Sequence, residues 1–352
     1  MGAVKRKPER RADLQVGFFA ELRQLTGGKN KMTILVKTEL ETEIETEDAS
    51  RNIERQIGNT PLLSFRRVTK DLPANVRVLA KAEWQNPGGS VKDRAAYGII
   101  SCAEADGQLR PGKTILDSTS GNTGIAYAMI GAAKGYRVKL FLPENVSPER
   151  VSILRAYDVD LVFTDPLEGS DGAIQAVQAL AAREPERYFY ADQYSNPANW
   201  QAHYQGTGAE IWRGTKGAVT HFVAGLGTSG TLMGAGRRLK EFSAAVQVVS
   251  VEPDSPFHGL EGLKHMESAI RPAIFDPYFA DQALSVRTEE AHAMALRLAR
   301  EEGYLVGISS AAAMIGALRV AEALAERERS GTVVTLFPDN AYKYLSEAFW
   351  RG

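Results

Sequence analysis

The sequence predicts an α/β fold of two lobes, each a mostly parallel sheet flanked by helices. Two observations predict this fold. From Gly58 onward, strand-like apolar runs alternate with helix-like segments, and glycine-rich turns separate them. The chain has 352 residues, of which 44% are hydrophobic, so it can bury a large core and divide into two lobes. Such alternation favours a parallel sheet covered on both faces, with ligand sites at the carboxyl ends of the strands.

Each element follows from its pattern of apolar and turn residues. Short runs rich in valine, isoleucine and leucine predict strands, and apolar residues at helical spacing predict helices. The predicted strands are residues 76–84, 113–118, 137–143, 159–165, 220–227, 246–253 and 331–339. The predicted helices include residues 91–107, 123–135, 147–157 and 288–303.

Charge and cysteine content exclude several classes of protein. Lys and Arg number 42 and Asp and Glu 43, which leaves no global basic field for nucleic acid. Cys102 is the one cysteine, which excludes an intrachain disulfide and cysteine-rich metal sites. The 5 histidines are scattered without ligand spacing, so we predict no metal. We find no apolar run of membrane-spanning length and no secretory signal, and expect a cytoplasmic protein.

An oddly placed lysine lies in the segment NPGGSVKDR, residues 86–94. Ser90 is a good helix N-cap, so Lys92 falls in the first helical turn, where unpaired amides and the helix dipole repel a cation. This position, close to Arg94 in sequence, should weaken the preference of the amine for its charged state. We therefore expect Lys92 to be an activatable nucleophile. The alternative is a solvated surface lysine paired with Asp93.

A first strand-to-helix turn is a candidate site for a carboxylate. Residues 117–129 read DSTSGNTGIAYAM, and we expect the helix to begin near Gly124. Small hydroxyl, amide and glycine residues at a helix start can cradle an anion of this size. Taken alone, the turn is better explained as an ordinary capped loop.

A second turn, GLGTSG at residues 225–230, is a candidate site for a phosphate. It matches the G-x-G-x-x-G fingerprint after a strand, and Glu252 closes the next strand about 20 residues later, so an NAD-dependent dehydrogenase is a rival hypothesis. The same loop suits one phosphate group, bound by backbone amides and by the hydroxyls of Thr228, Ser229 and Thr231.

One cofactor accounts for an activatable lysine, a carboxylate-sized loop and a phosphate-sized loop together. Pyridoxal phosphate uses a lysine for its aldehyde and a glycine-rich loop for its phosphate, and its amino-acid substrate needs a carboxylate site. We therefore predict pyridoxal 5'-phosphate as the cofactor.

Five motifs occur in an order that resembles the cysteine synthase family of fold type II pyridoxal-phosphate enzymes, in particular cysteine synthase B. They are NPGGSVKDR, TSGNTG, QYSNPAN, GLGTSGT and GISSAAAM, and the likeness covers roughly residues 53–347. The resemblance implies that Lys92 is the Schiff-base lysine and proton-transfer group. For the cofactor it further implies Asn122 at the ring oxygen, Ser309 at the pyridine nitrogen, and Gly227, Thr228, Ser229, Gly230 and Thr231 at the phosphate. For the substrate carboxylate it implies Thr119, Ser120, Gly121, Thr123 and Gln193.

The resemblance also implies a reaction. An activated L-serine, either O-phosphoserine or O-acetylserine, undergoes β-elimination to an aminoacrylate, and a sulfur nucleophile then adds to give L-cysteine. This β-replacement makes the enzyme a transferase. The alternatives are a cystathionine β-synthase-type β-replacement and, less favoured, the dehydrogenase that uses Gly225–Gly230. The sulfur donor stays open between sulfide, thiosulfate and the thiocarboxylate of a sulfur-carrier protein. A homodimer is expected by analogy, without nucleic-acid or membrane partners.

The segment EPDSPFHGLEGLKHM follows a predicted core strand, where relatives place a loop over the mouth of the active site. Relatives that prefer O-phosphoserine carry a basic residue there, so Lys264, with His265, is a candidate contact for the phosphate. The alternative is a solvated surface lysine near Glu261 and Glu267.

We expect three parts of the chain. Residues 1–50 form an N-terminal extension that we expect to be poorly packed or to contact a dimer partner. Residues 51–87 and 196–352 form the larger, cofactor-binding lobe. Residues 88–195 form a smaller, mobile lobe that closes over the substrate.

Overall fold

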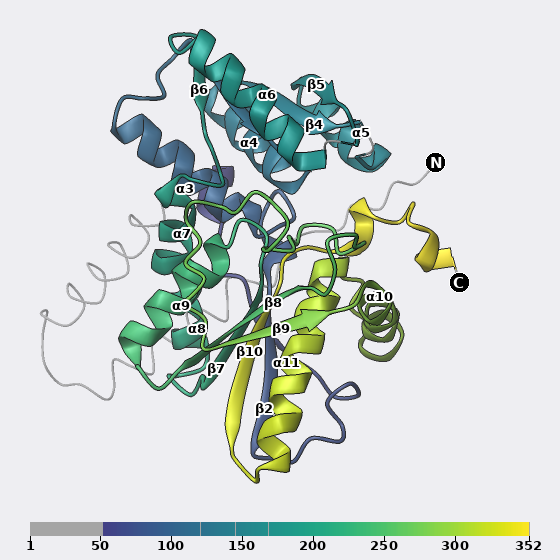
Figure 1. Ribbon diagram of the computed structural model, residues 1–352. Helices are drawn as coiled ribbons and strands as arrows, with labels where there is room; N and C mark the ends of the chain where they lie inside the picture. The colour runs from purple at the N-terminus through teal and green to yellow at the C-terminus, as the bar shows by residue number, and fades with distance from the viewer. Residues whose placement is uncertain (1–51, 120, 145, 168, 352) are drawn as a thin grey trace, which may run out of the picture. The chain divides into compact units, whose positions relative to one another are not determined.

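The computed structural model describes residues 52–119, 121–144, 146–167 and 169–351, without the side chains of 169 and 170. The expectations for residues 1–50 and for Ser120 lie outside the described residues. Within them, the predicted α/β fold is confirmed, with one six-stranded and one four-stranded sheet, each flanked by helices (Figure 1).

The six-stranded sheet is parallel except at one edge. Only β1 runs antiparallel to its neighbour, and every other pairing in this sheet is parallel. The strands are, in spatial order, β1 (Leu62–Ser64), β2 (Val76–Ala82), β10 (Gly331–Phe337), β7 (His221–Gly225), β8 (Gln247–Pro253) and β9 (Gln282–Val286).

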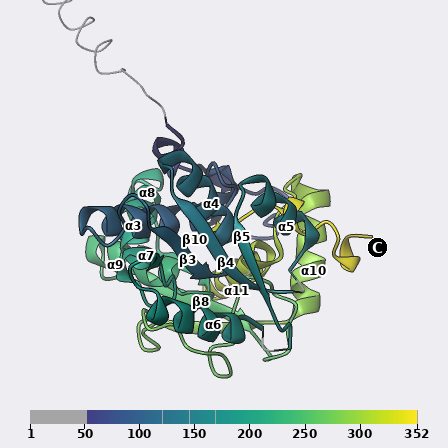
Figure 2. The ribbon, with the colours of Figure 1, turned by 90° about the horizontal axis from the view of Figure 1, so that it is seen from above.

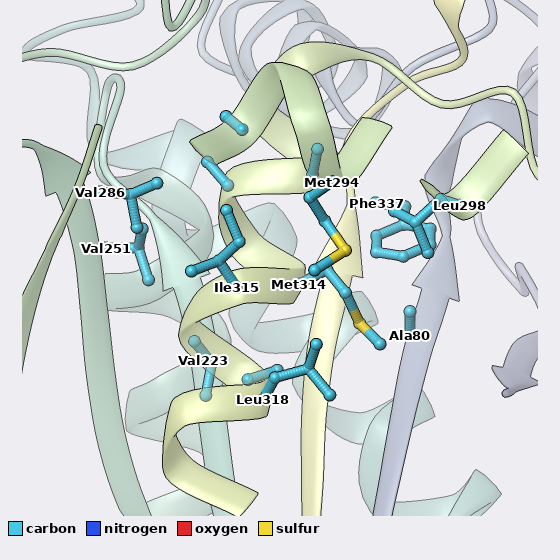
Figure 3. Close-up of a cluster of buried hydrophobic side chains, with 14 of the residues drawn as sticks. Ala80, Val223, Val251, Val286, Met294, Leu298, Met314, Ile315, Leu318 and Phe337 are labelled. Atoms are coloured by element: carbon cyan, nitrogen blue, oxygen red, sulfur yellow. The ribbon is translucent and has the colours of Figure 1, made fainter. Parts of the chain in front are cut away.

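Successive residues of these central strands enter two different cores. In β7, Val223 packs with residues of α10 (Thr288–Arg297) and α11 (Ile308–Glu326). Phe222 and Ala224 pack with residues of α8 (Ala209–Gly214) and α9 (Gly230–Phe242) on the opposite face. Figure 3 shows the first core, where Val223 and Val251 face Ile315 of α11. Burial on both faces explains why these strands read as continuous apolar runs.

The four-stranded sheet is wholly parallel and also has two covered faces. Ile115 packs with α3 and α4, whereas its neighbour Leu116 packs with α6. Figure 2 shows α4 and α6 on opposite sides of the strands. The strands are, in spatial order, β5 (Asp160–Thr164), β4 (Arg137–Pro143), β3 (Thr114–Ser118) and β6 (Tyr188–Tyr190).

The helices mostly connect consecutive strands. The α-helices are α3 (Lys92–Ala105), α4 (Asn122–Lys134), α5 (Pro148–Ala156), α6 (Gly169–Arg183), α7 (Pro197–Ala202), α8 (Ala209–Gly214), α9 (Gly230–Phe242), α10 (Thr288–Arg297) and α11 (Ile308–Glu326). The shorter pieces are the 3-10 helices η1 (Ile53–Gln56), η2 (Glu83–Gln85), η5 (Ala341–Lys343) and η6 (Ala348–Arg351), and the π-helices η3 (His203–Gly208) and η4 (Leu298–Glu302).

Several local features differ from the prediction. Strands β1, β6 and β9 were not predicted; the first two have 3 residues each, too few for a periodic pattern. Helix α4 begins at Asn122, two residues before the expected Gly124.

Helix α11 is long and apolar enough to cross a membrane, contrary to our expectation that no run reaches that length. However, 78% of its most apolar window is buried inside the protein. The helix packs against β10, β2 and β7, so its apolar composition is that of a core helix.

Candidate functional site

One cavity of about 920 Å³ lies where the carboxyl ends of strands from both sheets meet. This volume is within the range of small-molecule sites. From the four-stranded sheet and its helices, the predicted site residues that line it are Lys92, Thr119, Asn122, Thr123 and Gln193. From the six-stranded sheet they are Gly227, Thr228, Ser229, Gly230, Thr231, Lys264 and Ser309. Of the described candidates, Gly121 alone does not line the cavity.

Lys92 begins α3 and lines the cavity. Val91 rather than Ser90 occupies the N-cap position, although the Ser90 hydroxyl accepts a hydrogen bond from the Lys92 amide at 3.2 Å. Burial lowers the pKa of the Lys92 amine, and the charge of Asp339 opposes this shift. Within the described part of the chain the amine makes no hydrogen bond or ion pair. It is therefore placed to react as a neutral amine.

Arg94 does not tune Lys92 in the way the sequence suggested. Its guanidinium pairs with Glu83 at 2.6 Å and with Glu210 at 2.7 Å, and Lys81 pairs with Glu210 at 2.6 Å. This buried network of two cations and two carboxylates anchors the first turn of α3 to the six-stranded sheet and to α8. Burial of the amine, not the charge of Arg94, is therefore the cause of the shift at Lys92.

The alternative of a surface lysine paired with Asp93 is wrong. Asp93 is fully buried, and its Oδ2 accepts a hydrogen bond from the amide of Gly88 at 2.6 Å. Burial raises the pKa of Asp93 to about 7.

The loop before α4 is organised by its own hydroxyl group. Oγ1 of Thr119 accepts hydrogen bonds from the amides of Gly121 at 3.0 Å and Gly124 at 3.3 Å. Gly121 has φ +146°, and a Cβ there would lie 2.2 Å from Cδ of Arg150. Only glycine fits this position, which shapes the loop from outside the cavity.

Thr123 and Gln193 form a pair in the cavity wall. The hydroxyl of Thr123 donates to Oε1 of Gln193 at 2.7 Å, and Nε2 of Gln193 donates to the carbonyl of Ser118 at 2.8 Å. Both side chains are buried. Their hydrogen bonds tie the start of α4 to the segment after β6, so the cavity wall is rigid on this side.

The loop before α9 allows unusually close backbone approach. A Cβ at Gly227 would lie 2.4 Å from the carbonyl oxygen of Gly262, and one at Gly230 would lie 2.0 Å from Oδ1 of Asn199. Ser229 adopts a left-handed conformation with φ +67°, and its buried Oγ has no hydrogen-bond partner among the described atoms. Because the first amides of a helix also lack intrahelical partners, this loop fits a bound phosphate.

A neutral histidine supports the phosphate-sized loop, and sequence reasoning missed it. Nε2 of His203 lies 3.4 Å from Oγ1 of Thr231, and its Nδ1 lies 2.9 Å from Oγ1 of Thr207. Burial, with the nearby charge of Arg94, lowers the pKa of His203 to about 3. His203 begins the π-helix η3, a distortion that often marks functional sites.

Asn122 is held by three residues that sequence reasoning also missed. Its Nδ2 lies 2.7 Å from Oδ2 of Asp339 and 3.4 Å from the Tyr344 hydroxyl, and its Oδ1 accepts from Nζ of Lys343 at 2.9 Å. Asp339 is fully buried and follows the carboxyl end of β10. That position was a signal available in the sequence, because ligand sites of parallel sheets gather there.

Ser309 lies in the first turn of α11, with its side chain largely buried at the cavity wall. Its Oγ is 4.0 Å from where a Cβ on Gly262 would stand. A side chain at 262 is therefore disfavoured by the φ of +88° and not by crowding against Ser309.

Lys264 is not a solvated surface lysine. Its side chain is 10% exposed, and Nζ lies 3.3 Å from Oδ1 of Asp171 and 5.0 Å from the ring centre of Tyr194. Three residues earlier, Glu261 forms an ion pair with the buried Arg150 of α5. Two ion pairs thus join the segment 261–264 to α5 and α6, which flank the four-stranded sheet. The segment supplies the carboxylate to the first pair and the ammonium to the second.

Glu252, the acidic residue of the dehydrogenase hypothesis, makes a hydrogen bond to the protein's own backbone. Its Oε2 accepts a hydrogen bond from the amide of Met266 at 3.1 Å. It therefore braces the segment that carries Lys264. Among the described residues, no group of three or more His, Cys, Asp or Glu side chains is arranged to hold a metal ion.

Comparison with known proteins agrees with this geometry. A family model described as pyridoxal-phosphate dependent enzyme matches residues 53–339. A cysteine synthase of Aquifex aeolicus is 50% identical over 303 residues, which are 86% of this chain and 93% of that protein. Cysteine synthase B of Salmonella typhimurium is 40% identical over 294 residues, 84% of this chain and 94% of that protein. The crystal structure of a cysteine synthase (OASS) from Entamoeba histolytica matches with a TM-score of 0.81 at 35% identity, covering 87% of this chain and 92% of that one.

These matches confirm the resemblance to cysteine synthases and the pyridoxal phosphate cofactor, and they do not favour a dehydrogenase. The cavity residues fit that cofactor, because the unpartnered Ser229 hydroxyl and the free Lys92 amine lie on one cavity. The chain therefore belongs to the family of pyridoxal-phosphate dependent enzymes and is similar to the cysteine synthases within it.

Proposed function

We propose that the protein is a cysteine synthase that performs a β-replacement. It converts an activated L-serine and a sulfur donor into L-cysteine, which makes it a transferase. The observation that carries the proposal is that a reactive amine and two helix-start anion loops line one cavity. An amino-acid substrate and a phosphorylated aldehyde cofactor require these groups together.

The residues that would hold the cofactor come from both sheets. Lys92 would hold its aldehyde carbon, Asn122 its ring oxygen and Ser309 its pyridine nitrogen. The loop Gly227–Thr231 would hold its phosphate through backbone amides and hydroxyls. When bound there, pyridoxal phosphate supplies an electron-poor ring that makes the α-proton of an amino acid removable.

Lys92 also moves the proton. Its amine, whose neutral form burial favours by lowering the pKa, accepts the α-proton of the substrate. The resulting ammonium can return a proton after the sulfur has added. Ser309 is a neutral partner for the ring nitrogen and leaves it largely unprotonated, which favours elimination of the β-substituent.

The substrate carboxylate would bind at the start of α4. Thr119, Thr123 and Gln193 would form this cradle, with Gly121 shaping the loop from outside the cavity and Ser120 assigned by resemblance alone. The smaller lobe, residues 88–195, would close over the carboxylate and exclude water, while residues 51–87 and 196–352 hold the cofactor. The Asp171–Lys264 and Arg150–Glu261 ion pairs join helices of residues 88–195 to the segment around Lys264, which supports a closing movement there.

The leaving group would face Lys264. A buried ammonium beside the cavity suits the phosphate of O-phosphoserine better than the acetyl group of O-acetylserine, and a charge-assisted hydrogen bond adds about 1.5–3 kcal/mol, or roughly tenfold to a hundredfold in selectivity. Lys264→Ala should therefore lower kcat/KM for O-phosphoserine by that factor and leave O-acetylserine nearly unchanged. Equal losses for both esters would remove Lys264 from this role.

The assembly and partners follow the relatives by analogy. We propose a cytoplasmic homodimer whose sulfur donor is a small molecule or a sulfur-carrier protein.

The test of the proposed function is the fate of Lys92. The protein with bound cofactor should be yellow. Reduction with labelled borohydride should bleach this colour and attach the label to Lys92. Lys92→Ala should still bind the cofactor through the phosphate loop, but kcat for cysteine formation should fall by about a thousandfold or more. Lys70→Ala, at an exposed position, is the control. A Lys92→Ala enzyme with near-normal turnover, or a protein without bound cofactor, would refute the proposal.

A further inference from the structure

The amide of Asn122 can be oriented in only one way. Nζ of Lys343 donates a hydrogen bond to one end of the amide at 2.9 Å, so that end is the oxygen. Burial lowers the pKa of Lys343, but its amine carries N–H donors in either protonation state. Oδ2 of Asp339, 2.7 Å from the other end, accepts a hydrogen bond from the Tyr344 hydroxyl at 2.5 Å, and it accepts from Nδ2 of Asn122 as well. Burial raises the pKa of Tyr344, so its hydroxyl keeps the proton that it donates.

The two anchoring side chains are themselves fixed. Asp339 is fully buried, and its Oδ1 packs so closely against Gly307 that a Cβ there would lie 2.1 Å away, while its Oδ2 accepts from both Asn122 and Tyr344. Lys343 is 7% exposed and also donates to the carbonyl of Gly89 at 3.1 Å, in the turn before Lys92. The anchor is therefore rigid and touches both the Asn122 loop and the Lys92 turn.

The anchor and its target are far apart in the sequence. Asp339 and Lys343 lie in the segment that leaves β10 of the six-stranded sheet, coloured yellow in Figure 1, whereas Asn122 begins α4 beside the four-stranded sheet. The three side chains meet only because the two sheets direct these carboxyl-end segments to one cavity.

We propose that Asp339 and Lys343 are positioning residues that fix the Asn122 amide so that its nitrogen, not its oxygen, meets the ring oxygen of the cofactor. This inference rests on the proposed role of Asn122. Nδ2 has two hydrogens, and Asp339 takes one, which leaves the other for the cofactor or for the more distant Tyr344 hydroxyl. A reversed amide would place two oxygens against each other and destabilise the ionised form of the ring oxygen.

A competing explanation is that Asp339 and Lys343 only balance each other's charge. The charge of Asp339 acts to raise the pKa of Lys343 without a direct ion pair between these two described side chains. Removing one of two interacting buried charges is destabilising, whereas replacing both by apolar side chains is often neutral. Charge balance and amide positioning therefore predict different behaviour when both residues are replaced.

The experiment compares four variants with bound cofactor. Lys343→Met removes the donor to Asn122, Lys343→Arg keeps donors, and Asp339→Leu/Lys343→Met removes both charges. Ser310→Ala is the matched control, because the buried Ser310 hydroxyl donates to the Asp339 backbone carbonyl and does not touch Asn122. The measurements are the ratio of the two visible absorption bands that report the ionisation of the cofactor's ring oxygen, and the Tm.

We expect Lys343→Met to lower the Tm and to change the band ratio by about tenfold, the effect of losing one charged hydrogen bond. The double variant should recover the Tm but keep the altered ratio, and Lys343→Arg and Ser310→Ala should keep the wild-type ratio. A double variant with the wild-type ratio would show that the pair only balances charge and would overturn the inference.

A further variant covers the case in which Lys343→Met does not fold. Asp339→Asn removes the charge but keeps an oxygen acceptor for Nδ2 of Asn122, so its band ratio should stay within about twofold of the wild type. A large change in this variant would contradict the inference. A wild-type protein that binds no cofactor would instead contradict the proposed function, so the two failures are distinguishable.

Discussion

The two loops that begin α4 and α9 look alike in sequence but satisfy their polar groups differently. In the loop before α4, the Thr119 hydroxyl accepts hydrogen bonds from two backbone amides of the same loop and helix start. In the α9 loop, the buried Ser229 hydroxyl has no partner among the described atoms. A loop whose polar groups are hydrogen-bonded to each other suits a substrate carboxylate that binds and leaves in every turnover. A loop with an unpaired buried polar group suits a phosphate that stays bound, since unpaired buried polar groups are costly.

The start of α3 provides a third case. There the hydrogen-bond acceptor is the protein's own, because the buried Asp93 carboxyl group accepts a hydrogen bond from the amide of Gly88 in the preceding turn. In the proposed function, the three helix starts therefore differ in the source of the acceptor: the cofactor, the substrate or the chain itself. The following predictions test that difference, from the largest expected effect to the smallest.

Gly230→Ala should abolish retention of the cofactor. The new Cβ would lie 2.0 Å from Oδ1 of Asn199, so the loop before α9 must move and lose its close backbone approach. Cofactor absorbance after dialysis measures the loss. Gly135→Ala is the control, because no heavy atom lies within 4 Å of its Cβ position, although its positive φ, +78°, adds a backbone strain that Gly230 does not have. Full retention in Gly230→Ala would show that the loop does not hold the phosphate.

Asp93→Asn should remove a pH dependence of stability. Burial raises the pKa of Asp93 to about 7 in the folded protein, so the folded state binds an extra proton between about pH 4 and 7. Wild-type stability therefore falls relative to the variant as pH rises through that window, by on the order of 2–3 kcal/mol between pH 5 and 8.

The measurement is urea unfolding of both proteins at the two pH values. The asparagine keeps an oxygen acceptor for Gly88, so the fold should survive. Asp106→Asn, at an exposed position beyond the other end of α3, is the control. A stability difference that does not change with pH would mean that Asp93 is ionised throughout.

Ser229→Ala should weaken cofactor binding without affecting the substrate. The loss of one hydrogen bond to a charged phosphate corresponds to about tenfold to a hundredfold in affinity. Fluorescence titration of the apoprotein measures this change, and KM for the activated serine, at saturating cofactor, should stay unchanged. A change in KM alone would reverse the assignment of the two loops.

Thr119→Val should do the opposite and have the smallest effect. The valine keeps the shape but cannot accept the amides of Gly121 and Gly124, so KM for the activated serine should rise by about tenfold at unchanged cofactor affinity. Thr114→Val, at a buried position in β3, is the matched control. Loss of cofactor in Thr119→Val but not in the control would contradict the assignment of the loop before α4 to the substrate and the loop before α9 to the cofactor.

The site was predictable where its residues follow local rules. Glycines and small hydroxyl residues between a strand and a helix indicated both anion loops, and the structure places both on one cavity. Lys92 was recognisable because a cation is unusual in the first turn of a helix. These signals depend on a few neighbouring residues, so one sequence is enough to see them.

Other features were not predictable because they depend on side-chain direction. Arg94 is two positions from Lys92, yet it turns to Glu83 and Glu210 and leaves burial as the cause of the lysine's lowered pKa. The sequence left two environments possible for Lys264, a contact with the phosphate or a solvated surface position. In the structure it pairs with Asp171, which is 93 positions away in the chain. Sequence spacing does not show which way a long side chain points.

The sequence by itself determined the order of strands and helices, the two helix-start loops and the lysine between them, because backbone conformation at glycines and apolar periodicity act over short distances. Only the tertiary structure decided which groups are neutral, which are paired and which amide end faces the cavity. Asn122 meets Asp339 and Lys343 across 217 and 221 positions of chain. Burial and long-range contact set charge states and orientations, and both arise only when the two sheets pack around one cavity.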